Sequence, residues 1–597
     1  MTKANKILRV NLSTKRIRSE EVPEEWLNQF IGGKGLGAIY LYNELKKGVK
    51  ALSPENKLLF MWGPLTGLAP GCSRYCVVTK SPLTGAFLHS YSGGNFPSQL
   101  RFSLPDHLGI IFEGKAESSV YLKIDNGTAE LRDASKLKGK NIDEVCHYFE
   151  DYEVATIGPA GENLVKFATI SSDNGHHHAG RGGAGAVMGS KNLKAVVVRG
   201  KRPDVSQEVK NLQKEEVHRL ATSEITMGPR EGGTPRVVDM INKVGAFPTR
   251  NWTKGSFEHA NKINLEAVKK NAKKRVTCYN CPIACGFDLE MTEGLYKGLK
   301  TGRGPEYETL GMIGANLEIG DLSAVAKIAD LCNKLGMDTI SMGNVIGWTM
   351  ECSEKGLIDY KIKFGESQKA VELVEKIAYR KDIGDMLAEG VRYASDQVGR
   401  EAKEAAVEIK GLELPAYEPR GSFSMGLAYA TSDRGACHMR AWAIGGDVFG
   451  DRDPYSIQKG HAEAVIQEQN LRSVIPDSLV ACSFAGYTRA IDKVIEWLNL
   501  LGYDLDAKDI ELTGEQIWNL TRMFNVREGF CRNDDYLPRR MERPLKQGGP
   551  ADGNFIPKGD FDKMLSWYYE IRGWNEDGKP SVQKLKKLNL DKYYKFE

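Results

Sequence analysis

Three cysteines that lie within eight residues constrain this chain more than any other feature of its sequence. Cys278, Cys281 and Cys285 have the spacing C-x2-C-x3-C, and Pro282 follows the second of them. Iron–sulfur clusters are bound by cysteine thiolates, usually four, at short spacings of this kind. A structural zinc site is the main alternative, but its ligands usually come from two nearby pairs. No histidine lies between Cys285 and the next cysteine, Cys332, so the spacing favours a cluster.

The rest of the composition indicates a protein of a reducing compartment. Eleven cysteines spread over 597 residues do not form a disulfide framework. A net charge of +4 lacks the basic excess of a nucleic-acid-binding domain. No apolar run is long enough to span a membrane, and residues 1–20 have no signal-peptide pattern. We therefore expect a cytoplasmic protein that binds neither nucleic acid nor membrane.

The hydrophobic periodicity divides the chain into a β-rich N-terminal third and a mainly helical remainder. Short apolar runs bounded by glycine and proline predict strands at 7–12, 57–62, 76–79, 108–114, 120–124 and 193–198. One helix is expected within 141–149. Helical spacing then predicts helices at 209–223, 265–272, 321–335, 370–378, 391–398, 460–468, 490–501 and 515–524. We find no internal repeat at a fixed period, and we expect an α+β multidomain fold.

Three glycine strings lie in the β-rich part, at 63–75, 90–94 and 173–185. Backbone amides freed by glycine can form concave anion sites, and Arg74 and Arg181 add positive charge there. Tight turns between strands would explain any one string. Three strings with embedded arginines, in a chain that also has the cysteine loop, predict a cofactor that carries phosphate.

Two later loops, 333–338 and 477–482, resemble each other in length and position after a helical pattern. Paired loops of one pattern suggest two copies of a ligand at equivalent sites. The second loop ends in Cys482, which is the candidate for a fourth cluster ligand. The alternative is a small buried hydrophobic side chain, because free cysteine is often buried.

Acid–base candidates lie in two further segments. Glu306 and Glu308 belong to the segment 304–308, and His438 belongs to the segment 434–438. A single glutamate or histidine in a loop is often only solvated, so these residues need neighbours to indicate a function.

These segments occur together in the tungsten-containing aldehyde ferredoxin oxidoreductase family, which the chain resembles over essentially its full length. The resemblance is carried by the cysteine loop with Cys482 and by the segments 53–57, 63–67, 78–85, 157–163, 180–191, 304–308, 414–417 and 572–574. It implies a β-rich saddle domain under the cofactor and two mainly helical domains that close over it. We place these domains at residues 1–205, 206–413 and 414–597.

The resemblance also implies the cofactors. They are a tungsten bis-pterin, with molybdenum as the alternative metal, and a [4Fe-4S] cluster on Cys278, Cys281, Cys285 and Cys482. Arg74 would lie between the cluster and one pterin. The carbonyls of Tyr91 and His178 match positions that hold a Mg²⁺ ion bridging the pterin phosphates. The other residues expected to contact the cofactor are Ser92, Gly93, Gly94, His177, Ala179, Gly180, Arg181, Asn333, Asp338, Asp477 and Ala481.

The implied reaction is the oxidation of a small aldehyde with water to a carboxylic acid, reversible in principle. Electrons would pass through the cluster to ferredoxin or to an iron–sulfur partner subunit. Glu308 and His438 match residues beside the metal, where Glu308 would be the general acid/base and His438 a hydrogen-bond or proton donor. One alternative is a sister activity that reduces an acyl-CoA of the benzoyl-CoA type. Another is an iron–sulfur electron carrier without catalytic activity.

The chain departs from the family pattern at several positions. Asn333 stands where aspartate is usual, Val480 replaces a glycine, and His177 occupies a position often held by arginine. Lys327 and Asp330 replace a Glu-x-x-His pair that binds iron between subunits in some members. This last change favours a complex with electron-transfer subunits over an iron-bridged homodimer.

Overall fold

The computed structural model describes residues 3–594, and its N-terminal part consists of two six-stranded sheets with the same topology. Each sheet contains a hairpin, a parallel pair and three antiparallel pairs, in the strand orders β2-β1-β6-β3-β4-β5 and β8-β7-β12-β9-β10-β11. The six strands of the second sheet therefore have the same spatial order as the six equivalent strands of the first sheet.

The first sheet contains β1 (Lys6–Asn11), β2 (Ile17–Glu21), β3 (Leu58–Met61), β4 (Tyr75–Lys80), β5 (Phe87–Ser92) and β6 (His107–Glu113). The second contains β7 (Val120–Asp125), β8 (Thr128–Asp133), β9 (Glu153–Thr156), β10 (Ile170–Ser172), β11 (His177–Ala179) and β12 (Leu193–Arg199). A helix precedes the last strand of each set: α3 (Phe96–Ser103) and α6 (Ala184–Ser190). The sequence has no repeat at a fixed period, and the structure shows a repeat that lies in the topology and not in residue spacing.

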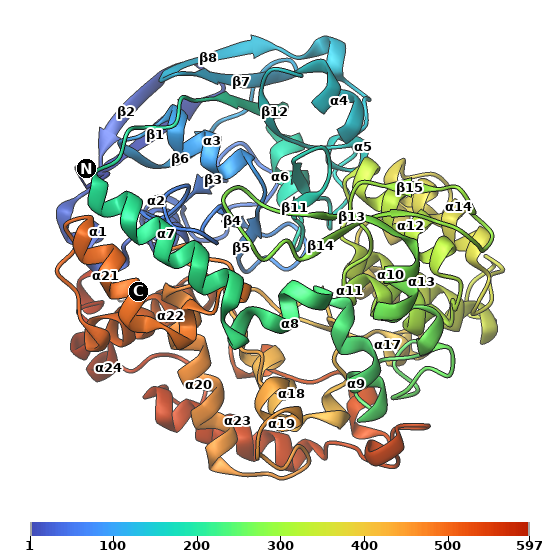
Figure 1. Ribbon diagram of the computed structural model, residues 1–597. Helices are drawn as coiled ribbons and strands as arrows, with labels where there is room; N and C mark the ends of the chain where they lie inside the picture. The colour runs from blue at the N-terminus through green and yellow to red at the C-terminus, as the bar shows by residue number, and fades with distance from the viewer. Residues whose placement is uncertain (1–2, 595–597) are drawn as a thin grey trace.

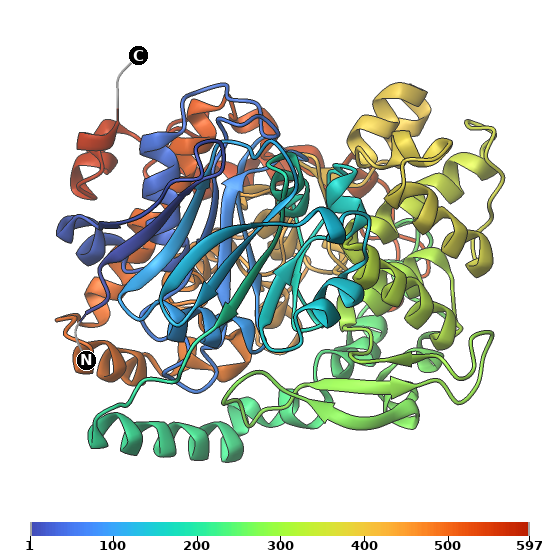
Figure 2. The ribbon, with the colours of Figure 1, turned by 90° about the horizontal axis from the view of Figure 1, so that it is seen from above.

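The two sheets lie next to each other and meet where β5 and β11 are in contact. Figure 2 shows the blue and cyan strands side by side, with helices of the later segments around them. Ser92 Oγ lies 3.0 Å from Ser172 Oγ, which ties the end of β5 to β10. The C-terminal end of β5 is thus brought next to the beginning of β11, where a Cβ at Gly93 would lie 3.2 Å from His177 Nδ1.

Helix α2 (Gly33–Glu44) packs closely on the first sheet because it carries glycines on the contacting face. A Cβ at Gly37 would lie 2.7 Å from the side chain of Val78, on β4. The spacing of apolar residues did not predict this helix, because glycine lowers helix propensity and the helix is buried on most of its surface.

Beyond residue 206 the chain is mainly helical, as expected, and the α+β prediction is confirmed. In Figure 1 most helices of residues 265–378 lie to the right of the sheets, and the orange helices of the C-terminal segment lie below the sheets. The helices are α7 (Gln207–Thr222), α8 (Glu224–Gly232), α9 (Val238–Lys243), α10 (Leu265–Asn271), α11 (Tyr307–Thr309), α12 (Leu322–Leu335), α13 (Thr339–Glu354), α14 (Ser367–Ala378), α15 (Ile383–Leu387), α16 (Val391–Val398), α17 (Arg400–Ala405), α18 (Phe423–Thr431), α19 (Ile444–Val448), α20 (Lys459–Val474), α21 (Ile491–Leu500), α22 (Ala507–Arg527), α23 (Lys558–Arg572) and α24 (Val582–Lys587). The shorter helices α1 (Glu24–Phe30), α4 (Ile142–Tyr148) and α5 (Pro159–Glu162) belong to the N-terminal part.

The cysteine loop connects two strands that the sequence did not predict. β13 (Ala272–Val276) and β14 (Gly286–Glu290) form an antiparallel hairpin, and β15 (Lys300–Thr301) extends it. Lys273 and Lys274 on β13 are exposed, so the strand lacks the apolar alternation that we used to find strands. A second small hairpin consists of β16 (Glu408–Ile409) and β17 (Leu412–Glu413).

Domain boundaries at 205/206 and 413/414 stay predictions; β12 ends before the first of them and β17 ends at the second. Among residues 3–594, no helix combines the length and the apolar character that crossing a membrane requires.

Two glycines at equivalent positions of the repeat pack against the two similar loops. Gly158 follows β9 and Gly63 follows β3, and each precedes a proline. A Cβ at Gly158 would lie 2.3 Å from the carbonyl oxygen of Leu335, and a Cβ at Gly63 would lie 2.4 Å from that of Leu479. Leu335 and Leu479 are the third residues of the loops 333–338 and 477–482. Each half of the saddle therefore holds one loop by close backbone contact, and Gly63 serves this contact instead of an open anion site.

We expect Gly158→Ala to destabilise the protein by about 1–3 kcal/mol, the usual effect of overpacking a tight contact. The loss would be measured as a lower midpoint of thermal unfolding. Gly460→Ala is the matched control, because nothing lies within 4 Å of a Cβ at Gly460. Equal midpoints for the two variants would contradict the close contact with the loop.

Candidate functional site

The structure brings the four expected sulfur ligands to one cavity. Cys278, Cys281 and Cys285 line it from the β13–β14 loop, and Cys482 lines it from the opposite side, just before a short 3-10 helix at Ser483–Ala485. The Cys482 N–H donates to the carbonyl of Gly71 at 2.9 Å, which fixes the turn. All four side chains are partly buried and none forms a disulfide. The cavity is also lined by Arg74.

The surroundings of these thiols fit an iron–sulfur cluster. Burial raises the pKa of Cys281 and Cys285 to about 12, and the neighbouring Cys482 adds to both rises. The thiols are therefore neutral in the metal-free chain, and binding iron would release their protons. The Gly94 N–H donates to Cys278 Sγ at 3.4 Å, as hydrogen bonds to cluster sulfurs do. A Cβ at Gly93 would lie 3.3 Å from the same sulfur, so glycine keeps this side of the cavity free.

The ends of β5 and β11 hold the residues that were expected to face phosphate. Tyr91 and Ser92 end β5 and Gly93 follows it, and the segment 177–180 includes β11 and the glycine after it. Ser171 Oγ lies 2.8 Å from His178 Nδ1. Burial lowers the pKa of His178 to about 3 and that of His177 well below its usual range. These histidines are therefore neutral and would meet phosphate through N–H groups and not through charge.

The guanidinium of Arg181, which follows Gly180, contacts other residues of the chain. Its Nη1 donates to the carbonyl of Ala436 at 2.6 Å, and its Nη2 donates to that of Glu413 at 2.5 Å. Its Nε lies 3.2 Å from Asp338 Oδ2. The guanidinium thus braces the first loop, and its expected contact with the cofactor stays a prediction.

The two loops hold their acidic residues differently. Asp338 caps α13 through the N–H groups of Ile340 and Ser341, whereas Asp477 is paired with Arg440 and lies 3.5 Å from Lys34 Nζ. Asn333 is partly buried near the end of α12, and Ala481 is buried. Val480 has a φ of +54°, a conformation that a β-branched residue rarely adopts, and this explains why glycine would suit the position.

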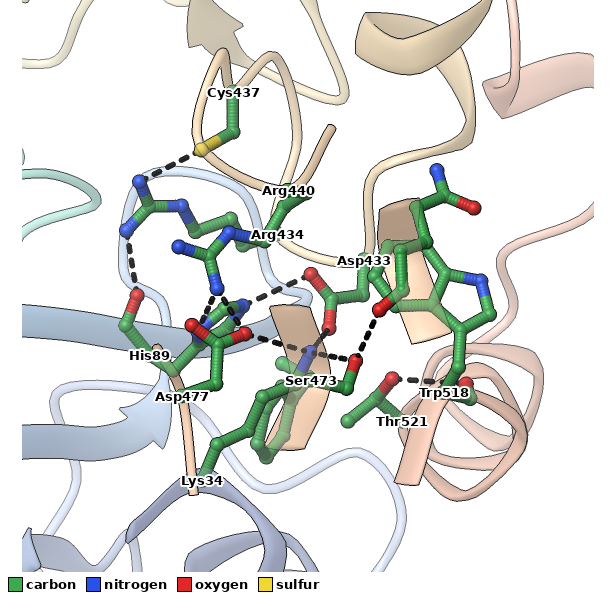
Figure 3. A network of polar contacts seen from close by, with 12 residues as sticks. Lys34, His89, Asp433, Arg434, Cys437, Arg440, Ser473, Asp477, Trp518 and Thr521 are labelled. Carbon is green, nitrogen blue, oxygen red and sulfur yellow. Dashed lines mark hydrogen bonds and ion pairs between the residues drawn. The ribbon is translucent and has the colours of Figure 1, made fainter. Parts of the chain in front are cut away.

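A buried polar network surrounds Asp477 (Figure 3). Lys34 Nζ lies 2.7 Å from Asp433 Oδ2, and His89 Nε2 lies 2.9 Å from Asp433 Oδ1. His89 Nδ1 lies 2.8 Å from Tyr91 Oη, so the network reaches the end of β5. Burial lowers the pKa of His89 to about 3 and keeps the ring neutral. The sequence analysis missed Lys34, His89 and Asp433, because only the fold brings their segments together.

Several atoms of this network fit a further polar ligand. Asp477 Oδ1, Arg434 Nε and Arg440 Nε are buried without a hydrogen-bond partner. Leaving a buried polar atom unpaired costs about 1–3 kcal/mol, so such atoms are expected where a cofactor supplies the missing partners. Arg434 Nη2 also lies 2.9 Å from Cys437 Sγ, as Figure 3 shows. Although burial opposes the change, Arg434 and Arg440 lower the pKa of Cys437 to about 7.

Glu308 and His438 lie together above this network. Glu308 Oε2 accepts a hydrogen bond from the Ala416 N–H at 2.8 Å, and Glu308 Oε1 lies 3.6 Å from His438 Nδ1. Neither Glu308 Oε1 nor His438 Nδ1 has a hydrogen-bond partner. Burial raises the pKa of Glu308 to about 8. Burial and then Arg181 lower the pKa of His438 well below its usual range, so the imidazole is neutral.

Aromatic side chains that the sequence analysis did not single out flank this pair. Tyr417 stacks on Tyr307 with ring centroids 4.9 Å apart and lies 5.9 Å from His438. The ring centroid of Trp442 lies 6.3 Å from that of Tyr417 and 5.7 Å from that of Phe449. Phe449 is 47% exposed. The segment 414–417 was noted only as a motif, since nothing in a sequence shows which aromatic rings face one site.

The chain matches two protein-family profiles over most of its length. One is "Aldehyde ferredoxin oxidoreductase, N-terminal domain", over residues 7–200. The other is "Aldehyde ferredoxin oxidoreductase, domains 2 & 3", over residues 211–590.

Curated relatives and a solved structure extend this similarity. The chain is 39% identical to a tungsten-containing aldehyde ferredoxin oxidoreductase of Pyrococcus horikoshii, covering 98% of this chain and 99% of the relative. It is 30% identical to the WOR-like subunit of an aliphatic sulfonate oxidoreductase of Pyrococcus furiosus, covering 98% and 96%. The active-site complex BamBC of benzoyl-coenzyme A reductase matches with a TM-score of 0.84 and 26% identity, covering 99% of this chain and 98% of that chain.

We expect Cys281→Ser and Cys482→Ser each to remove most of the iron from anaerobically purified protein, because a cluster usually needs four thiolates. Cys531→Ser is the matched control: it is another partly buried free cysteine, outside the cavity. Iron and acid-labile sulfide would be measured per chain. Full iron content in Cys482→Ser would exclude this residue as a ligand.

Proposed function

Because the chain belongs to the tungsten-containing aldehyde ferredoxin oxidoreductase family, we propose that it oxidises an aldehyde with water to a carboxylic acid. The two electrons released would pass through a [4Fe-4S] cluster to ferredoxin or to an electron-transfer subunit. The observation that carries this proposal is the buried pair of Glu308 and His438, whose facing polar atoms have no hydrogen-bond partner. Such a pair is suited to act on a substrate that binds beside both side chains.

The family implies tungsten bound by two pterins, and this group would accept the electrons of the substrate. The residues that would hold it lie at the ends of β5 and β11 and in the two similar loops, where Asp338 and Asp477 are the acidic members. Tyr91 and His178 belong to equivalent strands of the repeat, and their carbonyls would hold a Mg²⁺ ion that neutralises phosphate of the cofactor. Oxygen ligands of this kind suit magnesium.

Glu308 is the residue that we propose to activate water. Its pKa of about 8 lies close to neutral pH, which is the range in which a carboxylate can both accept and return a proton. The Ala416 N–H holds one carboxylate oxygen and leaves the other directed toward His438. Glu308 would take a proton from the attacking water in its ionised form.

His438 is proposed to orient the aldehyde. Its lowered pKa keeps the ring neutral, so the imidazole carries a single N–H. That N–H can donate to the carbonyl oxygen of the substrate. Tyr417 and Trp442 pack beside His438 and would restrict water around it.

The proposed electron acceptors follow from the relatives. One relative is named as a subunit, and the matched structure is of a complex. Asp330, at one of the positions where some family members bind iron between subunits, forms an ion pair with Lys334 at 2.8 Å. These observations support a complex with electron-transfer subunits or ferredoxin.

We expect Glu308→Gln to lower aldehyde-dependent reduction of viologen by about 10²–10⁴-fold, the usual contribution of a general base. We expect His438→Asn to lower the same activity by a factor in the same range. Glu408→Gln is the control, because Glu408 is a buried glutamate that hydrogen-bonds Arg392 and Tyr536 away from this pair. Full activity of both site variants with tungsten and iron intact would exclude these roles.

The pH dependence gives a separate prediction. Since burial raises the pKa of Glu308 to about 8, its ionised fraction grows as pH rises through this value. We expect kcat for aldehyde oxidation to increase with pH around 8, and Glu308→Gln to lose this increase. A wild-type kcat that falls between pH 7 and pH 9, in a range where the protein stays folded, would contradict the role of Glu308 as a base.

Reduction of an aromatic acyl-CoA is the second candidate function, because the chain shares a TM-score of 0.84 with the benzoyl-coenzyme A reductase complex. Comparing aldehyde oxidation with turnover of benzoyl-CoA, given reduced ferredoxin, separates the two. Elemental analysis of the purified protein tests both, since each needs iron together with tungsten or molybdenum. Iron alone would instead favour a simple electron carrier.

A further inference from the structure

A second arginine, Arg303, reaches the cysteine cavity from the turn between β15 and α11. Its Nη2 lies 3.9 Å from Cys285 Sγ, and its Nη1 lies 3.1 Å from His177 Nε2. Only 14% of the Arg303 side chain is exposed. One guanidinium therefore contacts both a sulfur of the cavity and the segment at the end of β11.

Glu306 fixes the position of this guanidinium. The Nε and Nη2 groups of Arg303 donate to Glu306 Oε1 at 3.0 and 2.7 Å. Thr234 Oγ1 donates to the other oxygen of Glu306 and accepts the N–H of Tyr307 at 2.9 Å. Nε and Nη2 are held by Glu306, Nη1 contacts His177, and Nη2 also contacts Cys285, so Arg303 has one well-defined orientation.

The two residues act on the sulfur with opposite sign. Arg303 Nη2 lies 3.9 Å from Cys285 Sγ, and the carboxylate of Glu306 lies 2.7 Å from the same nitrogen. A cluster gains one negative charge when it is reduced by one electron. A nearby positive charge therefore stabilises the reduced cluster, and a nearby negative charge destabilises it.

We propose that Arg303 is a positioning residue for electron transfer: its guanidinium raises the reduction potential of the cluster through Cys285 and orients His177, while Glu306 holds it and offsets part of its charge. The inference rests on the proposed function only in requiring the cluster. Glu306, which the sequence offered as an acid–base candidate, thus acts on the cluster side, and Glu308 acts on the substrate side.

The test is a redox titration of anaerobically purified holoprotein with dithionite, in which electron paramagnetic resonance follows the one-electron reduction of the cluster. We expect Arg303→Gln to lower the equilibrium constant for reduction about tenfold, which is about 59 mV for a one-electron couple. We expect Glu306→Gln to raise it. A general loosening of the loop would shift both variants in one direction, so the opposite signs identify the electrostatic role.

Two further variants keep the test decisive. Lys273→Gln is the matched control, because Lys273 belongs to the same hairpin but has an exposed side chain that pairs with Glu290. Arg303→Lys retains the charge and is expected to lie between wild type and Arg303→Gln. A shift in Arg303→Gln no larger than in Lys273→Gln would overturn the inference. If Arg303→Gln does not retain iron, unchanged potentials in both Arg303→Lys and Glu306→Gln would overturn it. A wild-type protein without iron would instead remove the proposed function.

Discussion

Positive charge that is buried between the segments of this chain needs negative partners, and this requirement holds the centre of the molecule together. Lys34 on α2 pairs with Asp433, which follows α18, and Arg440 pairs with Asp477 after α20. Removing one partner of a buried ion pair typically costs about 3–5 kcal/mol, so these distant segments depend on one another. The same interior keeps unpartnered polar atoms, which suits a protein that assembles around a polar cofactor.

The repeated sheet gives this charged centre its shape. In each half of the repeat one edge strand, β5 or β11, lies at the middle of the saddle. In each half, a glycine that precedes a proline packs against one of the two loops. The halves are nonetheless used differently. The first loop is braced by Arg181, whereas the second is tied to Lys34 and Arg440 and contains Val480 in a left-handed conformation.

The class of the fold could be predicted from the sequence, because half of the strands in the two sheets, and helices such as α12 and α22, have regular apolar patterns. The pattern failed at α2, where glycines allow close packing, and at β13, where lysines face solvent. The candidate site could be located through the cysteine spacing and the family resemblance. His89, Asp433, Arg303 and the brace formed by Arg181 could not, since their roles depend on contacts between residues more than a hundred positions apart.

The single cysteine at the end of only one of the two loops has a wider consequence. The scaffold is nearly symmetric, yet the second loop ends in Cys482, while the first loop ends at Asp338 and leads directly into α13. On the proposed assignment, the two halves of the organic cofactor would be electrically unequal, because only one of them would lie beside the cluster. A molecule built by doubling would then have a single terminal through which charge enters or leaves.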